Sequence, residues 1–219
     1  MKEIVAVLDP WSNNSPVRLR KATEGTGFSR FWTIGDVKIL NTPLLGLLCS
    51  IRCPGRVIVQ TYDLARALRD AGVPVIGGFH SPMEKECLDF LLRGKQPVVV
   101  CSARSITNMR IPSAWRKACA EERLLILSPF VPKHGRISAL LAEKRNRFVS
   151  FLADQLFVPY AAPGSKTEQL CRGLMSAGKR VYTFESERES NIAKAGAVPI
   201  ALDRLVSMMV ASHEIYRSR

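Results

Sequence analysis

The segment from residue 72 to residue 101 constrains the fold more than any other part of the chain, because it contains a strand, a glycine turn, a helix and a second strand. The first strand is expected over residues 73–76 and ends at Gly77 and Gly78. The second is expected over residues 97–101, an apolar run of the kind found in buried strands. Such a unit places its glycine turn at the carboxyl end of a strand, where open α/β sheets bind ligands.

The helix of this unit has a well-defined start in the sequence. Ser81 suits the N-cap position, and Pro82 suits the first turn, where its missing N–H would have no partner. Glu84 follows Ser81 by three residues, which is the spacing of a capping box. The sequence therefore predicts a helix that begins at Pro82, directly after the glycine turn.

Strand-like and helix-like segments alternate along the rest of the chain. Apolar runs predict strands over residues 44–49, 124–127, 155–158, 180–184 and 198–200. Amphipathic patterns predict helices over residues 57–70, 113–122, 137–152, 168–177 and 192–196, and a terminal helix from residue 202. Alternation at this spacing indicates a parallel sheet covered on both faces. The predicted fold class is α/β, a Rossmann-like three-layer α/β/α domain with a mostly parallel sheet.

The N-terminal part gives weaker signals. We expect a strand over residues 3–8, a polar loop with at most one helical turn over residues 9–30, and a short hairpin over residues 31–40. The composition shows no break that would suggest a second domain. We therefore expect one domain over residues 1–219, with an N-terminal extension (1–40), a core (41–201) and a C-terminal helix (202–219).

The charge of the chain is unbalanced. It carries 32 lysine and arginine residues against 19 aspartate and glutamate residues, a net charge of +13. Between residues 104 and 147 there are ten basic side chains and three acidic ones. This excess favours a polyanionic partner, such as nucleic acid, nucleotide phosphates or an acidic protein. A generally basic, solubilising surface is the alternative.

Other classes of protein are disfavoured by what the sequence contains. No run of 18 apolar residues is present, and residues 1–14 do not resemble a signal peptide, so a cytoplasmic protein is expected. The six cysteines are scattered, and only Cys49 and Cys53 lie close together. We therefore expect reduced cysteines, no metal site and no cofactor.

Three predicted turns follow strands and would share one edge of a parallel sheet. Each turn precedes a helix, and the free N–H groups of a helix N-terminus can bind anions. The candidate phosphate- or nucleic-acid-binding residues of these turns are Ser50, Arg52, Gly77, Gly78, His80, Ser81, Gly164, Ser165, Lys166 and Thr167. His80 could also serve as an acid or base. The alternative is that these are ordinary tight turns with solvated polar groups.

A further candidate lies on the helix predicted over residues 137–152. There Arg145, Asn146 and Arg147 place two guanidinium groups beside an amide, and arginine forks suit phosphate. The alternative is a solvated helix face. The dinucleotide fingerprint G-x-G-x-x-G is absent, and the Walker pattern is incomplete because Pro159 stands where its first glycine is required.

At these positions the chain resembles the DprA/Smf family of DNA-processing proteins, within the wider group that includes the LOG cytokinin-activating enzymes. The likeness extends over residues 44–184. Four segments carry the likeness. Residues 49–52 match a strand ending in Gly-Ser-Arg, and residues 75–79 match a strand ending in Ser-Gly-Leu-Ala. Residues 145–147 match an Arg-Asn-Arg, which is followed at residues 152–154 by a leucine, a small residue and an aspartate, and residues 163–167 match a Ser-Gly-Ser-x-x-Thr turn.

This resemblance implies binding of single-stranded DNA in a basic pocket at the carboxyl edge of the sheet. It also implies a homodimer and a recombinase as protein partner. The family's pocket positions correspond here to Arg52, Gly77, Gly78, Arg145, Asn146 and Ser165. One departure is clear, because residues 81–84 read Ser-Pro-Met-Glu where the family has Arg-Gly-Ile-Asp.

We therefore expect a DprA-like nucleic-acid-binding protein, with single-stranded DNA as ligand and no assigned catalytic residue. One alternative is a nucleotide-binding sensor or a LOG-like nucleotide N-glycosidase (phosphoribohydrolase) that would use Glu84 or Glu168. The LOG motif survives only as a remnant over residues 163–168. The other alternative is a scaffold whose basic surface binds an acidic protein partner.

Overall fold

In the computed structural model, which describes residues 5–13 and 15–218, apolar runs of three to five residues form a single sheet of nine strands. The order across the sheet is β1-β2-β6-β5-β4-β3-β7-β8-β9. The strands are β1 (Ala6–Leu8), β2 (Phe31–Ile34), β3 (Leu45–Leu47), β4 (Val75–Gly77), β5 (Val98–Cys101), β6 (Leu124–Ser128), β7 (Gln155–Phe157), β8 (Val181–Phe184) and β9 (Val198–Ile200).

The sheet is parallel from β6 to β9, and only β2 runs antiparallel to its two neighbours, β1 and β6. The carboxyl ends of the parallel strands therefore lie at one edge, as predicted. The chain reverses its direction of travel across the sheet between β3 and β7, which pair side by side. Such a switch point is where open α/β sheets usually have a ligand crevice.

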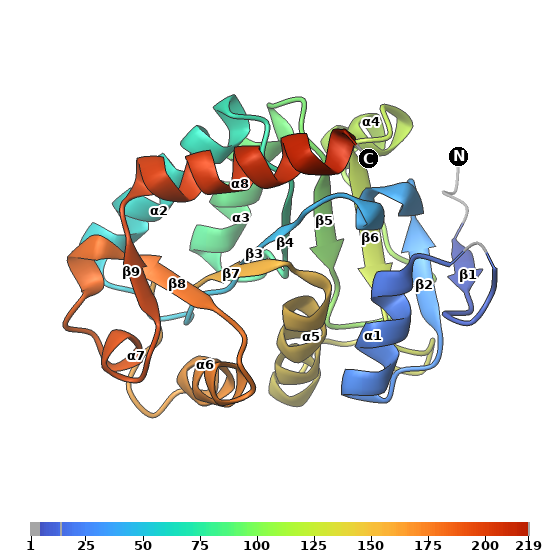
Figure 1. Ribbon diagram of the computed structural model, residues 1–219. Helices are drawn as coiled ribbons and strands as arrows, with labels where there is room; N and C mark the ends of the chain where they lie inside the picture. Colours follow the sequence, from blue (N-terminus) through green and yellow to red (C-terminus); the bar gives the residue numbers. More distant parts are fainter. Residues whose placement is uncertain (1–4, 14, 219) are drawn as a thin grey trace.

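Helices cover both faces of the sheet (Figure 1). They are α1 (Val17–Thr26), α2 (Gly55–Asp70), α3 (Pro82–Leu92), α4 (Ser113–Ala120), α5 (Ala139–Leu152), α6 (Lys166–Ser176), α7 (Asn191–Lys194) and α8 (Leu202–Arg217), with short 3-10 helices η1 (Val37–Asn41) and η2 (Glu185–Glu187). None of these helices, within the described part of the chain, combines the length and apolar character that crossing a bilayer requires.

Two separate hydrophobic cores hold the layers together. Side chains of α2, α3, α4 and α8 pack on one face of the sheet, with Leu64 and Leu205 fully buried among them. Side chains of α1, α5, α6 and α7 pack on the other face, with Leu19 and Phe148 fully buried. The predicted Rossmann-like three-layer α/β/α fold with a mostly parallel sheet is confirmed.

The N-terminal predictions were partly wrong. Residues 9–30, expected as a loop, contain the ten-residue helix α1, whose sequence carries few apolar residues. Its helical state depends on Leu19 and Ala22, which are fully buried against the sheet, and it ends at Gly27, with a φ of +74°. Tertiary packing therefore overrides a weak local pattern. The strand predicted over residues 3–8 is found over Ala6–Leu8, and residues 3 and 4 lie outside the described residues.

The predicted hairpin over residues 31–40 was also wrong. Phe31–Ile34 forms β2, but its partners are β1 and β6 rather than the residues that follow. Those residues form η1 instead, because the Asp36 side chain accepts a hydrogen bond from the Lys38 N–H at 2.9 Å and starts a helical turn. β1 and β2 thus continue the sheet beyond β6.

Candidate functional site

The turn between β4 and α3 contains the predicted capping box. Ser81 Oγ accepts the Glu84 N–H at 3.2 Å, and Glu84 Oε2 accepts the N–H groups of Ser81 at 3.0 Å and His80 at 3.1 Å. Glu84 is buried. The N–H groups that we expected to bind phosphate therefore donate to the protein's own carboxylate, and its negative charge disfavours an anion at this helix end.

The turn between β7 and α6 uses the same device. Ser165 Oγ accepts the Glu168 N–H at 3.2 Å, and Glu168 Oε2 accepts the Gly164 N–H at 2.6 Å. The neighbouring Asn191 amide and Arg172 guanidinium, with the Gly164 N–H, lower the pKa of Glu168 to about 2. This carboxylate is thus an ion that stabilises the turn, and it occupies the Gly164 N–H, one of the groups where phosphate was expected.

Ser50 connects the turns that follow β3 and β7 at the switch point. Its hydroxyl accepts the Ala162 N–H at 3.0 Å and lies 3.3 Å from Ser165 Oγ. Arg52, two residues further on, is exposed. The hydroxyl groups of the two turns therefore bind each other and the backbone rather than facing a ligand cavity.

Arg145 connects α5 to the end of β5 at the carboxyl edge of the sheet. From α5 its Nη1 donates to the Cys101 carbonyl at 3.0 Å, and its Nε donates to the Asn146 side chain at 2.8 Å. The guanidinium is 4% exposed and lies against Gly78, where an added Cβ would overlap it. Burial lowers the pKa of Arg145, and the nearby Glu84 carboxylate opposes this shift. Gly78 thus provides the space for a cation beside the β4–α3 turn.

A hollow of 480 Å³ opens beside this cation, at the carboxyl ends of β4 and β5. We call it the basic pocket. Five of its lining residues carry a basic side chain, and two are aromatic: His80, Lys85, Arg104, Arg136, Arg145, Phe79 and Trp115. Among the described residues that line the pocket, none carries a carboxylate. The pocket therefore combines positive charge with ring surfaces.

The walls of the basic pocket are fixed by the backbone. The Ser128 hydroxyl, at the end of β6, donates to the Arg104 carbonyl at 2.7 Å. The Ser105 N–H donates to the His134 carbonyl at 2.8 Å, which joins the loop after β5 to the loop after β6. Phe79 is buried and has a φ of +46°, a conformation that bulky residues rarely adopt outside functional sites.

The residues predicted from sequence fall into three groups. Gly78, His80 and Arg145 line the basic pocket, while Gly77, Ser81 and Asn146 lie directly behind these residues in the fold. Ser50, Arg52, Gly164, Ser165 and Thr167 belong to the turns after β3 and β7 and do not line it. Arg147 and Lys166 lie in a separate groove between α5 and α6.

Sequence reasoning did not single out Lys85, Arg104, Arg136 and Trp115. The dense basic run between residues 104 and 147 was the available signal for the two arginines. Trp115 lies on α4 and gave no signal, because its approach to the pocket depends on how α4 packs. Two other aromatic residues, Phe130 and Phe148, are buried, and Phe148 stacks on Phe31 with ring centroids 5.2 Å apart.

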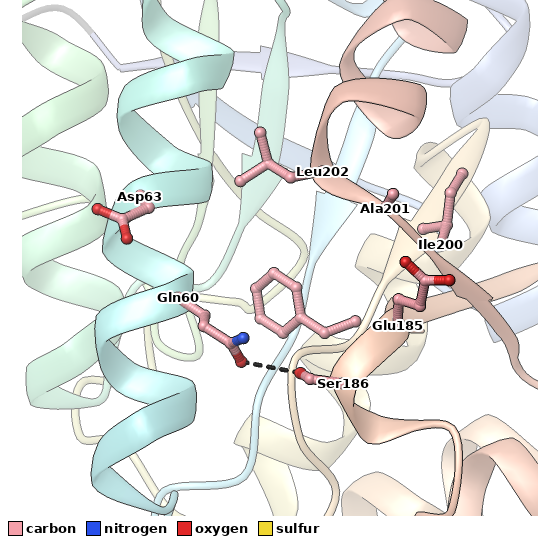
Figure 2. Close-up of a pocket in the computed structure, with 8 residues that line it drawn as sticks. Gln60, Asp63, Glu185, Ser186, Ile200, Ala201 and Leu202 are labelled. Atoms are coloured by element: carbon pink, nitrogen blue, oxygen red, sulfur yellow. Dashed lines mark hydrogen bonds between the residues drawn. The ribbon is translucent and has the colours of Figure 1, made fainter.

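A second hollow near the same edge has the opposite charge. It measures 310 Å³ and is lined by Gln60, Asp63, Phe184, Glu185, Ser186, Ile200, Ala201 and Leu202. Figure 2 shows the Ser186 hydroxyl bonded to the Gln60 side chain across it, at 3.0 Å. Its two carboxylates pair with Arg66 and Arg188. This hollow is a poor site for an anion, so the basic pocket is the stronger candidate for a phosphate-bearing ligand.

Comparisons with known proteins agree with this architecture. The family model of DNA recombination-mediator protein A matches residues 7–203. No match was found among curated proteins. The fold is similar to that of DNA processing protein A (DprA) from Streptococcus pneumoniae, with a TM-score of 0.74 and 14% identity, covering 92% of this chain and 73% of that one.

Two other solved structures are similar. DNA processing protein A from Helicobacter pylori, whose structure concerns its single-stranded DNA binding mode, has a TM-score of 0.72 and 19% identity, covering 95% of this chain and 97% of that one. The molybdenum cofactor binding protein from Rippkaea orientalis has a TM-score of 0.52 and 11% identity, covering 78% of this chain and 96% of that one. At these identities the likeness concerns the fold.

Proposed function

The chain belongs to the family of DNA recombination-mediator protein A, as its resemblance to DprA/Smf proteins predicted, and we propose that it binds single-stranded DNA in the basic pocket. The observation that carries this proposal is the convergence of five basic side chains and two aromatic rings in one hollow, with no carboxylate among its described lining residues. Arginine and lysine side chains hold backbone phosphates, and ring surfaces stack on unpaired bases.

The shape of the pocket supports a single strand over a duplex. A concave hollow of 480 Å³ can admit an unpaired base together with its phosphate, whereas the bases of a duplex are stacked away from such a recess. Trp115 is half-buried, so its ring is held in place by the core and is still partly open to the pocket, whereas Phe79 is buried and forms part of the wall. A rigid ring loses little conformational entropy when a base stacks on it.

Anisotropy of a labelled 20-nucleotide oligothymidylate tests the proposal, with a labelled duplex of equal length beside it. We expect tighter binding of the single strand and an affinity that falls steeply with salt, because each phosphate contact with a single strand adds roughly 0.7 to the logarithmic salt slope. Equal and weak binding of both nucleic acids would contradict the proposal.

The double variant Arg104→Ala with Arg136→Ala tests the pocket itself. Both side chains reach solvent at least partly, so the variant should fold, and we expect at least a tenfold loss of affinity. Arg204→Ala is the matched control, since it removes an exposed arginine of α8, on the face of the sheet opposite α5. An unchanged affinity in the folded double variant would show that the DNA binds elsewhere.

The hydrolase and sensor alternatives receive little support from the two carboxylates they would use. Glu84 accepts two backbone N–H groups, and Glu168 is occupied by Gly164 and Arg172. A carboxylate with a pKa near 2 is a poor general base or acid at neutral pH. The remaining alternative is a scaffold whose basic surface binds an acidic protein. Weak binding of both the single strand and the duplex would favour this alternative.

The proposal extends to assembly and location. A recombination-mediator family suggests a recombinase as the protein partner, and we expect the DNA-binding form to be a homodimer in the cytoplasm. Static light scattering of the protein with and without oligothymidylate measures the oligomeric state. Pull-down with purified recombinase, with Arg204→Ala as reference, tests the partner.

A further inference from the structure

The α5–α6 groove is a hollow on the face of the sheet that carries α1, and it is separate from both the basic pocket and the hollow beside Gln60. It measures 310 Å³ and is lined by Glu143, Arg147, Phe151, Lys166, Gln169, Leu170, Gly173, Leu174 and Ala177. Figure 1 shows α5 and α6 next to each other on that face. Arg147 and Lys166, which sequence reasoning connected with phosphate, both belong to this groove.

Two helical stripes form the groove. Glu143, Arg147 and Phe151 follow each other at intervals of four residues on α5, so they share one face of that helix. On α6 the wall is open at Gly173, where an added Cβ would meet no atom within 4 Å. The groove is therefore open at this point of α6 rather than filled by a side chain.

The groove places two basic side chains near an aromatic ring. The Arg147 guanidinium lies 6.0 Å from the centre of the Phe151 ring, and Phe151 is half-buried against the core. Lys166 Nζ lies 3.7 Å from Glu143 Oε2, but the lysine side chain is 70% exposed, so this ion pair is weak and open to exchange. A phosphate can replace Glu143 as the partner of Lys166. A base can stack beside Arg147 on the side of the Phe151 ring that does not face Gly25 of α1.

The groove and the basic pocket open toward the same edge of the sheet. Lys166 begins α6 directly after Ser165, at the carboxyl end of β7. Arg145 and Arg147 are two residues apart on α5, so one reaches the basic pocket and the other reaches the groove. Only the width of one helix separates the two sites, about 10 Å, which corresponds to about three phosphates of a stacked strand.

We propose that a single strand bound in the basic pocket continues over the N-terminal part of α5 and enters the α5–α6 groove. There Arg147 and Lys166 contact its phosphates, and Phe151 stacks on one of its bases. This inference rests on the proposed function, because it requires a strand that starts in the basic pocket. It predicts that affinity depends on oligonucleotide length, since a short strand fills only one site.

Competition with unlabelled oligothymidylates of 4 and 20 nucleotides tests the inference in the double variant Arg147→Ala with Lys166→Ala. Both side chains are exposed, so the variant should fold, which circular dichroism checks. We expect about a tenfold loss of affinity for the 20-mer, no change for the 4-mer, and a salt slope for the 20-mer smaller by about 1.4, the equivalent of two phosphate contacts. Arg204→Ala should change neither affinity.

The two proposals fail in different ways. An unchanged 20-mer affinity in the groove variant, with a clear loss in the Arg104→Ala, Arg136→Ala variant, would overturn the groove and leave the pocket. A loss for both the 4-mer and the 20-mer in the groove variant would also overturn it, because the groove would then act on the first site. If neither variant changes binding, the proposed function itself fails.

Discussion

The turns after β4 and β7 share the same helix-capping hydrogen bonds, but they differ in the side chains and the space beside them. Each has a serine that caps a helix and a glutamate, three residues later, that accepts backbone N–H groups of the turn. At the first turn Gly78 admits a buried guanidinium, and a basic pocket opens beside it. At the second, the Ser165 hydroxyl lies 3.3 Å from the Ser50 hydroxyl. Both turns therefore have a capped helix, and they differ because the Arg145 guanidinium of α5 reaches only the first turn.

The N-termini of α3 and α6 contribute less to anion binding than their positions at this edge suggest. A glutamate at each helix end accepts N–H groups of the turn, so its charge offsets the helix dipole and weakens the attraction for phosphate. Affinity for phosphate at this edge therefore depends mainly on side chains. The site therefore depends on which side chains the neighbouring elements contribute, and the β4 turn receives the buried guanidinium of Arg145.

Replacing Arg145 should have the largest effect. Arg145→Ala leaves the buried Cys101 carbonyl without its donor and Glu84 without its nearby cation, so we expect a loss of about 3 kcal/mol in the free energy of unfolding. DNA affinity should fall with it. At the second turn Arg172→Ala removes only a half-exposed partner of Glu168 and should cost less than about 1 kcal/mol. Urea unfolding measures the stability of the two variants, and anisotropy measures their DNA affinity. Equal losses of stability in Arg145→Ala and Arg172→Ala would contradict the distinction between the two turns.

The two glycines give the next contrast. Gly78→Ala places a Cβ where the Arg145 guanidinium lies, and overpacking of this kind costs about 2 kcal/mol. Gly164→Ala meets no atom within 4 Å, but its φ of +72° makes alanine unfavourable by about 1 kcal/mol. The informative readout is anisotropy, in which only Gly78→Ala should weaken DNA binding. Intact binding in Gly78→Ala would mean that the displaced guanidinium is not needed.

The capping serines should behave alike. Ser81→Ala and Ser165→Ala each remove a hydroxyl that accepts one helix N–H, and loss of such a cap costs about 1 kcal/mol. Because both hydroxyls face their own helices, DNA affinity should stay the same once folding is complete. Thermal unfolding and anisotropy at a temperature well below the transition separate the two effects. A selective loss of binding in Ser81→Ala would make its hydroxyl a ligand contact.

The smallest effect concerns acid. The pKa of Glu168 is lowered from 4.5 to about 2, so the ionised carboxylate stabilises the fold above pH 4.5, and this contribution disappears as the pH falls to about 2. Glu168→Gln should therefore reduce the dependence of unfolding free energy on pH within that window. Urea unfolding at pH 2 to 5 measures the slope. An unchanged slope would show that other carboxylates dominate acid unfolding.

Local chemistry made much of the fold predictable. The capping box at Ser81 and Glu84 and the alternation of strands and helices from β3 onward could be derived because each depends on neighbouring residues. α1 could not, since its helical state depends on Leu19 and Ala22 meeting the sheet. A sparse apolar pattern contains no information about a distant partner.

The site was less predictable for the same reason. The residue type of Arg145 suggested phosphate, but its burial against Gly78 depends on the fit between α5 and the β4–α3 turn. Arg147, only two residues away, faces another groove, because successive helix positions point in different directions. Trp115 and Arg136 reach the pocket from α4 and from the loop after β6.

The close contact between Gly78 and Arg145 also determines at what point during synthesis the basic pocket is complete. The ribosome produces β4, α3 and β5 before α5, so the cation beside the glycine turn is missing until much of the chain has emerged. A nascent chain that stops short of α5 would have the turn but not its guanidinium. On the proposed function, nucleic-acid binding at this edge requires a chain that has docked α5.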